Sequence, residues 1–119
     1  MTAATVGSVR VVELEEPGGW RVLVPETRRE RMRGLRAHSP PGPRVGMLFL
    51  GCRSVHTFGM SSPIRVAFLD AELRVVVVLD RPPRRLILPR RGAVHVLESA
   101  AGSPLRVGDR LRSRVRAER

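Results

Sequence analysis

The sequence predicts a mainly β protein of the α+β class. We expect a small barrel-like or folded antiparallel or mixed sheet of about seven to nine short strands, with one or two short helices. Two observations carry this prediction. Short apolar or alternating stretches follow one another along most of the chain, and clusters of Gly, Pro, Asp or Ser separate them at short intervals. Only one stretch has the signature of a helix start.

The first elements form a predicted hairpin. Residues 9–12 and 20–24 are rich in valine, which favours strands, and Pro17-Gly18-Gly19 between them is a turn signal. Antiparallel pairing of the two stretches follows from the short connection.

A helix is expected next, over residues 28–36. Thr27 followed by Glu30 has the form of a capping box, in which each side chain bonds a backbone N–H group at the helix start. Met32 and Leu35 would form its buried side. The proline-rich stretch 38–46 can then be neither helix nor inner strand, so it is expected to be a loop.

The rest of the chain predicts a succession of strands and turns. Strands are expected at 47–50, 55–60, 64–69, 73–79, 86–88, 93–97 and 110–115. The four consecutive valines predict that 73–79 is the central, mostly buried strand. Turns are expected at 70–72, 101–104 and 107–109, with Asp70 and Asp109 capping their turns.

Length and composition restrict the class of protein. The 119 residues fit one domain, 1–119, and carry a net charge of +11. All basic residues are arginine, and Lys, Asn, Gln and Tyr are missing, as expected from a G+C-rich genome. No apolar run approaches the ~20 residues of a membrane span, and no signal peptide begins the chain. Cys52 is the single cysteine, which excludes an internal disulfide. We therefore expect a cytoplasmic protein without membrane insertion.

Several short motifs, taken in order, resemble those of one family. They are Arg31-Met32-Arg33-Gly34-Leu35, Gly46-Met47-Leu48-Phe49, His56-Thr57-Phe58-Gly59-Met60, Pro63-Ile64 leading to Val66-Ala67-Phe68-Leu69-Asp70, Val96-Leu97-Glu98 with Ala101-Gly102, and Gly108-Asp109. From about Trp20 to Leu111 the chain is similar to the domain of unknown function 192 family (uncharacterised protein family 0127), in its compact branch. The resemblance implies a small, mainly β fold with helical additions. It implies no activity.

Three positions depart from that family pattern. Arg65 stands where the family usually has Asp, Ser61 where it often has a basic residue, and His38 where it usually has Arg. If these positions form a shared polar site, this chain has altered it.

Cys52, His56 and Met60 are spaced at four, which places them on one face of either a strand or a helix. A thiolate, an imidazole and a thioether would suit Cu(I) or Zn²⁺. An extended strand separates residues four apart by ~13 Å, however, so one metal ion would require a bend. Cys52 with His56 could also act as nucleophile and base. The competing interpretation, which we favour, is a core Cys, a core Met and a hydrogen-bonded His.

Glu98 follows an apolar stretch and is expected close to the core, where a carboxylate needs a partner. Arg33, or another arginine of the predicted helix, is a candidate. The functional interpretation is an acid that orients a ligand or accepts a proton. The structural interpretation is an ion pair that closes the barrel, and it is the one we favour from sequence.

Arginines gather in several clusters that could bind a polyanion. Candidate contacts are Arg81, Arg84, Arg85, Arg112 and Arg114. In the last predicted strand, even spacing places the arginines on one face, where acids of the first strand (Glu13, Glu15 and Glu16) could neutralise them. No interleaving of basic and aromatic residues is present, so any binding of nucleic acid would be mostly electrostatic.

Three hypotheses of function remain. We favour a binding or accessory module for a small ligand or partner protein, because no catalytic constellation is complete. The first alternative is electrostatic binding of nucleic acid or another polyanion, such as an acidic protein. The second is a metal- or thiol-dependent enzyme that uses Cys52, His56 and Glu98. No cofactor is predicted.

Overall fold

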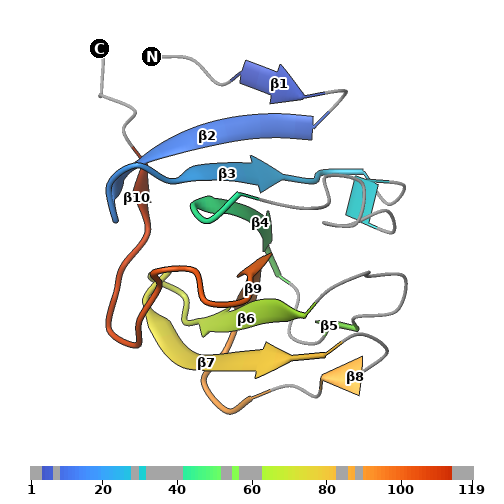
Figure 1. Cartoon of the computed structure of the whole chain (residues 1–119), viewed down its shortest axis with the longest axis vertical. Coiled ribbons are helices and arrows are strands. Elements are labelled where there is room, and N and C mark those ends of the chain that lie inside the picture. Colours follow the sequence, from blue (N-terminus) through green and yellow to red (C-terminus); the bar gives the residue numbers. More distant parts are fainter. Residues whose placement is uncertain are drawn as a thin grey trace.

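A curled β-sheet dominates the molecule (Figure 1). This computed structural model describes residues 4–6, 9–27, 30–31, 42–51, 55–56, 63–82, 86–87 and 90–113. The strands are β1 Ala4–Val6, β2 Val9–Glu16, β3 Arg21–Val24, β4 Val45–Phe49, β5 Val55–His56, β6 Ile64–Leu69, β7 Val75–Arg81, β8 Leu86–Ile87, β9 His95–Ala100 and β10 Arg112–Ser113. The mainly β fold class predicted from sequence is confirmed.

The sheet has the order β1-β2-β3-β4-β9-β6-β7, and β10 pairs with β2 off this path. All neighbouring pairs are antiparallel except β3 and β4, which are parallel. Residues 105–113 link the two ends of the curled sheet, because Arg110 bridges to Arg74 beside β7 while β10 pairs with β2 (Figure 1). A half-barrel results, and a separate two-stranded ribbon of β5 and β8 accompanies it.

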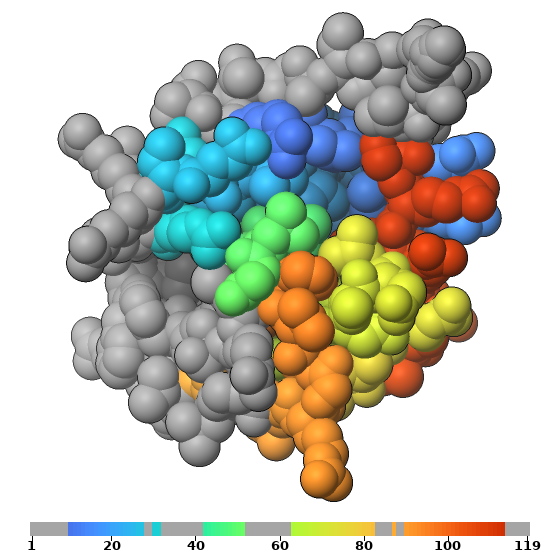
Figure 2. Space-filling view, turned by 180° about the vertical axis from the view of Figure 1, so that it is seen from behind, coloured from blue at the N-terminus to red at the C-terminus, as the bar shows by residue number. Residues whose placement is uncertain are grey.

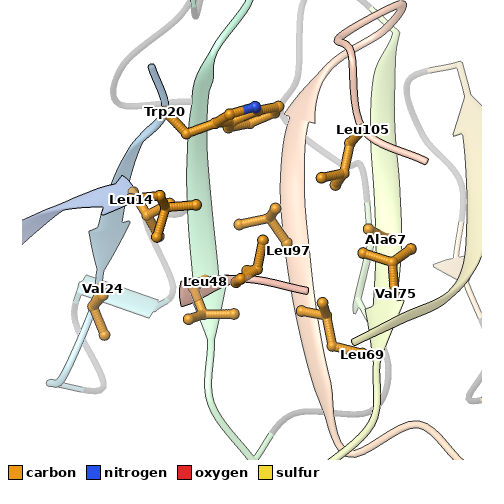
Figure 3. Close-up of a cluster of buried hydrophobic side chains, with 11 residues drawn as sticks. Leu14, Trp20, Val24, Leu48, Ala67, Leu69, Val75, Leu97 and Leu105 are labelled. Atoms are coloured by element: carbon orange, nitrogen blue, oxygen red, sulfur yellow. The ribbon is translucent and has the colours of Figure 1, made fainter. Parts of the chain in front are cut away.

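One face of the sheet, which we name the Leu97 face, is concave. Side chains from β2 to β7 converge there, and Leu105 and Leu111 of the linking segment join them (Figure 3). Trp20 fills one end of this core and is 1% exposed. Burial of apolar side chains from both ends of the sheet at once is what stabilises its curl.

The opposite face, the Glu98 face, carries a second core. Its members come from the same strands, with Met47, Val66 and Val96 at its middle. Ile87 of β8 and Ala93, both buried, pack into this core from outside the large sheet. The strands of the sheet are therefore apolar on both faces, which explains their continuous rather than alternating hydrophobicity.

The prediction that residues 73–79 form the central strand is wrong. β7 lies at the end of the strand order, and Val76 to Leu79 are only half-buried. The central position between β4 and β6 belongs to β9. The apolar run of β7 arises because both of its faces touch a core. The outer edge at the start of β7 is bonded to the linking segment: the Val75 N–H donates to the Asp109 carbonyl, and the Gly108 N–H donates to the Val75 carbonyl.

Other strands differ from expectation in their bounds. β1 was not predicted, and β9 extends through Ala100, so that Glu98 lies within the strand rather than after it. Of the stretches expected at 55–60 and 110–115, the structure shows β5 and β10, and residues 57–60 and 114–115 lie outside the described residues. The predicted hairpin of β2 and β3 is confirmed.

The capping box is confirmed. The Thr27 hydroxyl accepts a hydrogen bond from the Glu30 N–H at 3.1 Å, and the Glu30 carboxylate accepts from the Thr27 N–H at 3.1 Å. The Arg31 N–H then donates to the Thr27 carbonyl, as in the first turn of an α-helix. Residues 32–36, with Met32 and Leu35, lie outside the described residues.

The end of β4 forms hydrogen bonds with two other segments on the back of the molecule. Figure 2 shows residues 42–51 (green) between the cyan segment that ends at residue 31 and the orange segment that leads into β9. Arg31 Nη2 donates to the Leu50 carbonyl at 3.1 Å, and the Gly51 N–H donates to His95 Nδ1 at 2.8 Å. This bond gives His95 a structural role.

Candidate functional site

Glu98 occupies the middle of a row of side chains that crosses the sheet. Cross-strand register aligns it with Met47 on β4 and with Val66 on β6. From β2 to β7, the row in order is Val11, Leu23, Met47, Glu98, Val66 and Leu79. Every other member is apolar, so the Glu98 carboxyl group is the single polar side-chain group of this row.

The Glu98 side chain is deeply buried. The residue is 5% exposed, and its two flanking side chains are at most 1% exposed. Burial disfavours the charged carboxylate and raises the pKa of Glu98 to about 8. The group is therefore mostly a neutral carboxylic acid at pH 7, able both to donate and to accept a hydrogen bond.

Among the described residues, no side chain or backbone N–H group forms an ion pair or hydrogen bond with the Glu98 carboxyl group. Its neighbour Ser99, on the other face, has such a partner: the Ser99 and Ser103 hydroxyls lie 2.7 Å apart. Arg33, the partner proposed from sequence, lies outside the described residues. The ion pair therefore stays a prediction.

The proposed Cys52, His56 and Met60 site is not brought together by the described residues. His56 belongs to β5, in register with Leu86 of β8, whereas Cys52 and Met60 lie outside the described ranges. Within the part of the chain that the structure describes, no three His, Cys, Asp or Glu side chains gather closely enough to hold a metal ion. Both the metal and the thiol hypotheses stay predictions.

Two of the candidate polyanion contacts can be placed, and both have internal partners. Arg112 on β10 lies 3.8 Å from carboxylate oxygens of Glu15 and of Glu16 on β2, as the structural alternative expected. Arg81, at the end of β7, donates to the Asp80 carbonyl at 2.9 Å. Arg84, Arg85 and Arg114 lie outside the described residues.

Arg65, one of the departures from the family pattern, has a structural role here. Its guanidinium donates two bonds of 2.8 Å to the Asp80 carboxylate and one of 2.6 Å to the Ser103 carbonyl. The hydrogen bonds from Arg65 hold the pKa of Asp80 below its usual value. This arginine ties β6 to β7 and to the segment that follows β9. Ser61 and His38 lie outside the described residues.

Sequence reasoning identified Glu98 but not the row around it. Met47 and Val66 are distant in the chain, and only the order β4-β9-β6 places them on either side of the acid. A signal was present nevertheless. Glu98 is two residues beyond Val96, so strand alternation already placed both on one face of a longer β9.

The fold and the site together define a class: a curled, mainly β domain with one buried acid on a hydrophobic sheet face. The model of the family DUF192, described as Uncharacterized ACR, matches residues 11–113, which is nearly the whole chain. The chain belongs to this family, and the resemblance inferred from the sequence is confirmed. No curated protein matches the chain significantly.

Two solved structures share the fold. One is a crystal structure of a protein of unknown function from Novosphingobium aromaticivorans DSM 12444, with 22% identity and a TM-score of 0.75, covering 93% of this chain and 92% of that chain. The other, from Sinorhizobium meliloti 1021, is provisionally described as a transcription regulator. It has 23% identity and a TM-score of 0.68, covering 88% of this chain and 91% of that chain. At this level of identity the likeness shows the fold alone.

Among the described residues, no helix has the length and apolar character needed to cross a bilayer.

Proposed function

We propose that the protein is a binding module for a small organic ligand, held on the Glu98 face of the sheet by a hydrogen bond to the Glu98 carboxyl group. One observation carries this proposal: Glu98 is buried at the centre of an apolar row and has no partner among the described residues. A buried polar group without a partner lowers stability by about 1–3 kcal/mol, and such groups are uncommon in folded proteins. A ligand would supply the missing partner.

Internal ion pairs favour this proposal over polyanion binding. The described arginines meet acids repeatedly, as in the pairs of Arg112 and Arg65. These two arginines are thereby less available to the phosphate groups of a polyanion.

Replacement of the acid tests the proposal. A small-molecule library would be screened by thermal unfolding against the wild type and Glu98→Leu. We expect the free Glu98→Leu protein to unfold at a higher temperature, because an apolar side chain replaces an unpartnered acid. The variant should also lose the rise in unfolding temperature that a binding compound gives the wild type.

Ser99→Ala is the matched control. Ser99 adjoins Glu98 but points to the other face, where its hydroxyl meets Ser103. This variant should be less stable than the wild type yet keep the full response to the compound. A compound that stabilises Glu98→Leu and wild type equally, or a library without any effect on the wild type, would refute the proposed function.

A further inference from the structure

The peptide group between Leu50 and Gly51 is held from both sides. Its carbonyl oxygen accepts a hydrogen bond from Arg31 Nη2 at 3.1 Å, and its N–H group donates to His95 Nδ1 at 2.8 Å. The two bonds join the capping box, the end of β4 and the start of β9, which lie side by side in Figure 2. One peptide group thus links the capping box to β9.

The bond from Gly51 fixes the state of the His95 ring. Nδ1 can accept a hydrogen bond only while it carries no proton, so the neutral ring carries its proton on Nε2. His95 is half-buried, so protons can reach it from the solvent. Histidines change their charge between about pH 5 and pH 8, and a proton on Nδ1 turns this acceptor into a donor. The bond from the Gly51 N–H and a charged His95 therefore exclude each other.

Other charged groups around His95 come from its neighbouring elements. β4 has none, and Glu98 of β9 lies on the opposite face. The remaining described ones are Glu30 and Arg31 beside the Leu50–Gly51 peptide group, Asp70 after the end of β6, and Arg90 and Arg91 in the turn before β9. Among the described residues, no carboxylate forms an ion pair with His95. Asp70 Oδ1 instead accepts two backbone N–H groups of its own turn. The described contact that depends on the charge of the ring is thus the bond from Gly51.

The Leu50–Gly51 peptide group has a second orientation that suits a charged ring. Rotation of the group by half a turn changes chiefly the ψ angle of Leu50 and the φ angle of Gly51, which is +71° here and would become negative. Glycine adopts positive and negative φ about equally readily, and both residues are exposed, so packing does not hold the group in place. After rotation the Leu50 carbonyl oxygen points to His95 and can accept a hydrogen bond from its protonated Nδ1.

We propose that His95 and the Leu50–Gly51 peptide group form a pH-sensitive switch. With a neutral ring, the peptide group joins Arg31 to His95. Uptake of one proton by His95 reverses the peptide group, so that the Leu50 carbonyl accepts from His95 and gives up its bond from Arg31. No covalent bond is made or broken. Acid thereby detaches the capping box from the end of β4, independently of Glu98.

Nuclear magnetic resonance of the full chain tests the switch. At about pH 8, a coupling across the hydrogen bond should connect the Gly51 amide nitrogen to His95 Nδ1, and at about pH 5 it should be absent. The protection of the Gly51 amide from hydrogen exchange, corrected for the intrinsic effect of pH, should fall at least about fivefold between the two. In His95→Asn, a side-chain oxygen that does not titrate replaces Nδ1, so the protection should not depend on pH. Equal protection at both pH values in the wild type, or the same pH dependence in His95→Asn, would overturn the proposal.

A second variant tests the rotation of the peptide group. Alanine is strained at the positive φ of Gly51 but not after rotation, and its Cβ would meet no heavy atom within 4 Å. Gly51→Ala should therefore raise the pH midpoint of the transition by about one unit. Gly102→Ala is the matched control, because Gly102 has a φ of +81° and equally open surroundings, and its midpoint should equal that of the wild type. A midpoint in Gly51→Ala equal to that in Gly102→Ala would contradict the rotation and with it the switch.

Discussion

Glu98 and Ser99 are adjacent residues of β9 that face opposite sides of the sheet, and their surroundings differ sharply. On the Leu97 face, Ser99 meets Ser103, and Arg65 meets Asp80 and a backbone carbonyl, so the described polar groups there satisfy one another. On the Glu98 face, the flanking positions hold Met47 and Val66. The first arrangement is that of a structural network, whereas the second leaves a polar group available to a ligand.

Gly46 shows how closely β4 and β9 approach each other. A Cβ atom at this position would lie 2.9 Å from Leu97 Cδ1 and 3.3 Å from the Glu98 carbonyl oxygen. Leu97 is fully buried and cannot move aside without disturbing the concave core. The glycine of the Gly46-Met47-Leu48-Phe49 motif is therefore required by packing beside the candidate site.

Gly46→Ala should reduce the free energy of unfolding by about 1–3 kcal/mol, because the added methyl group overpacks the contact between the two strands. Urea unfolding measures the effect. Gly42→Ala is the control: its Cβ would lie 3.5 Å from Val45 Cγ2, an ordinary contact, so stability should change little. Equal effects of the two substitutions would show that the close approach of β4 and β9 is not what requires the glycine.

At the scale of elements, local chemistry was predicted well and neighbour relations were not. The hairpin of β2 and β3, the capping box at Thr27 and the turn at Asp70 follow from short-range rules, and each is confirmed. The positions of β7 and β9 in the strand order do not follow from short-range rules. Both strands are apolar, and hydrophobicity reports burial but not which strand lies between which others. Only the order of pairing makes β9 central and thereby buries Glu98.

The capping box at Thr27 allows a test at the scale of elements. Thr27→Ala removes the hydroxyl that accepts the Glu30 N–H, so the free energy of unfolding should fall by about 1 kcal/mol in a urea titration. Thr27→Ser keeps a hydroxyl at the same place and should retain most of the stability. Equal stability of Thr27→Ala and wild type would mean that the first helical turn contributes nothing to the folded state.

At the scale of the whole molecule, the fold is held by contacts between distant parts of the chain. Residues 105–113 join β7 to β2, and the parallel pairing of β3 with β4 needs the long connection between them. Sequence periodicity cannot specify such pairings, because it carries no information on sequence-distant partners. For the same reason the candidate site was only partly predictable: the acid was visible in the sequence, and its apolar row was not.

The central claim is that Glu98 is a buried, neutral and unpartnered acid, and the pH dependence of stability tests it most directly. The free energy of unfolding would be measured by urea titration between pH 3 and pH 9 for the wild type and Glu98→Gln, and the difference between the two would be followed. Burial raises the pKa of Glu98 to about 8 in the folded protein, whereas an unfolded chain releases this proton near 4.5. The folded state thus binds the extra proton, and wild-type stability must fall relative to Glu98→Gln as the pH rises between these values.

We expect the folding equilibrium constant of the wild type, relative to Glu98→Gln, to fall about tenfold per pH unit up to pH 8 and then to level off. A relative stability of the wild type that instead increases as the pH rises from below 4.5 would show that folding lowers the pKa of Glu98. That result would mean an ionised Glu98 with a cationic partner such as Arg33, and it would contradict the proposed ligand site.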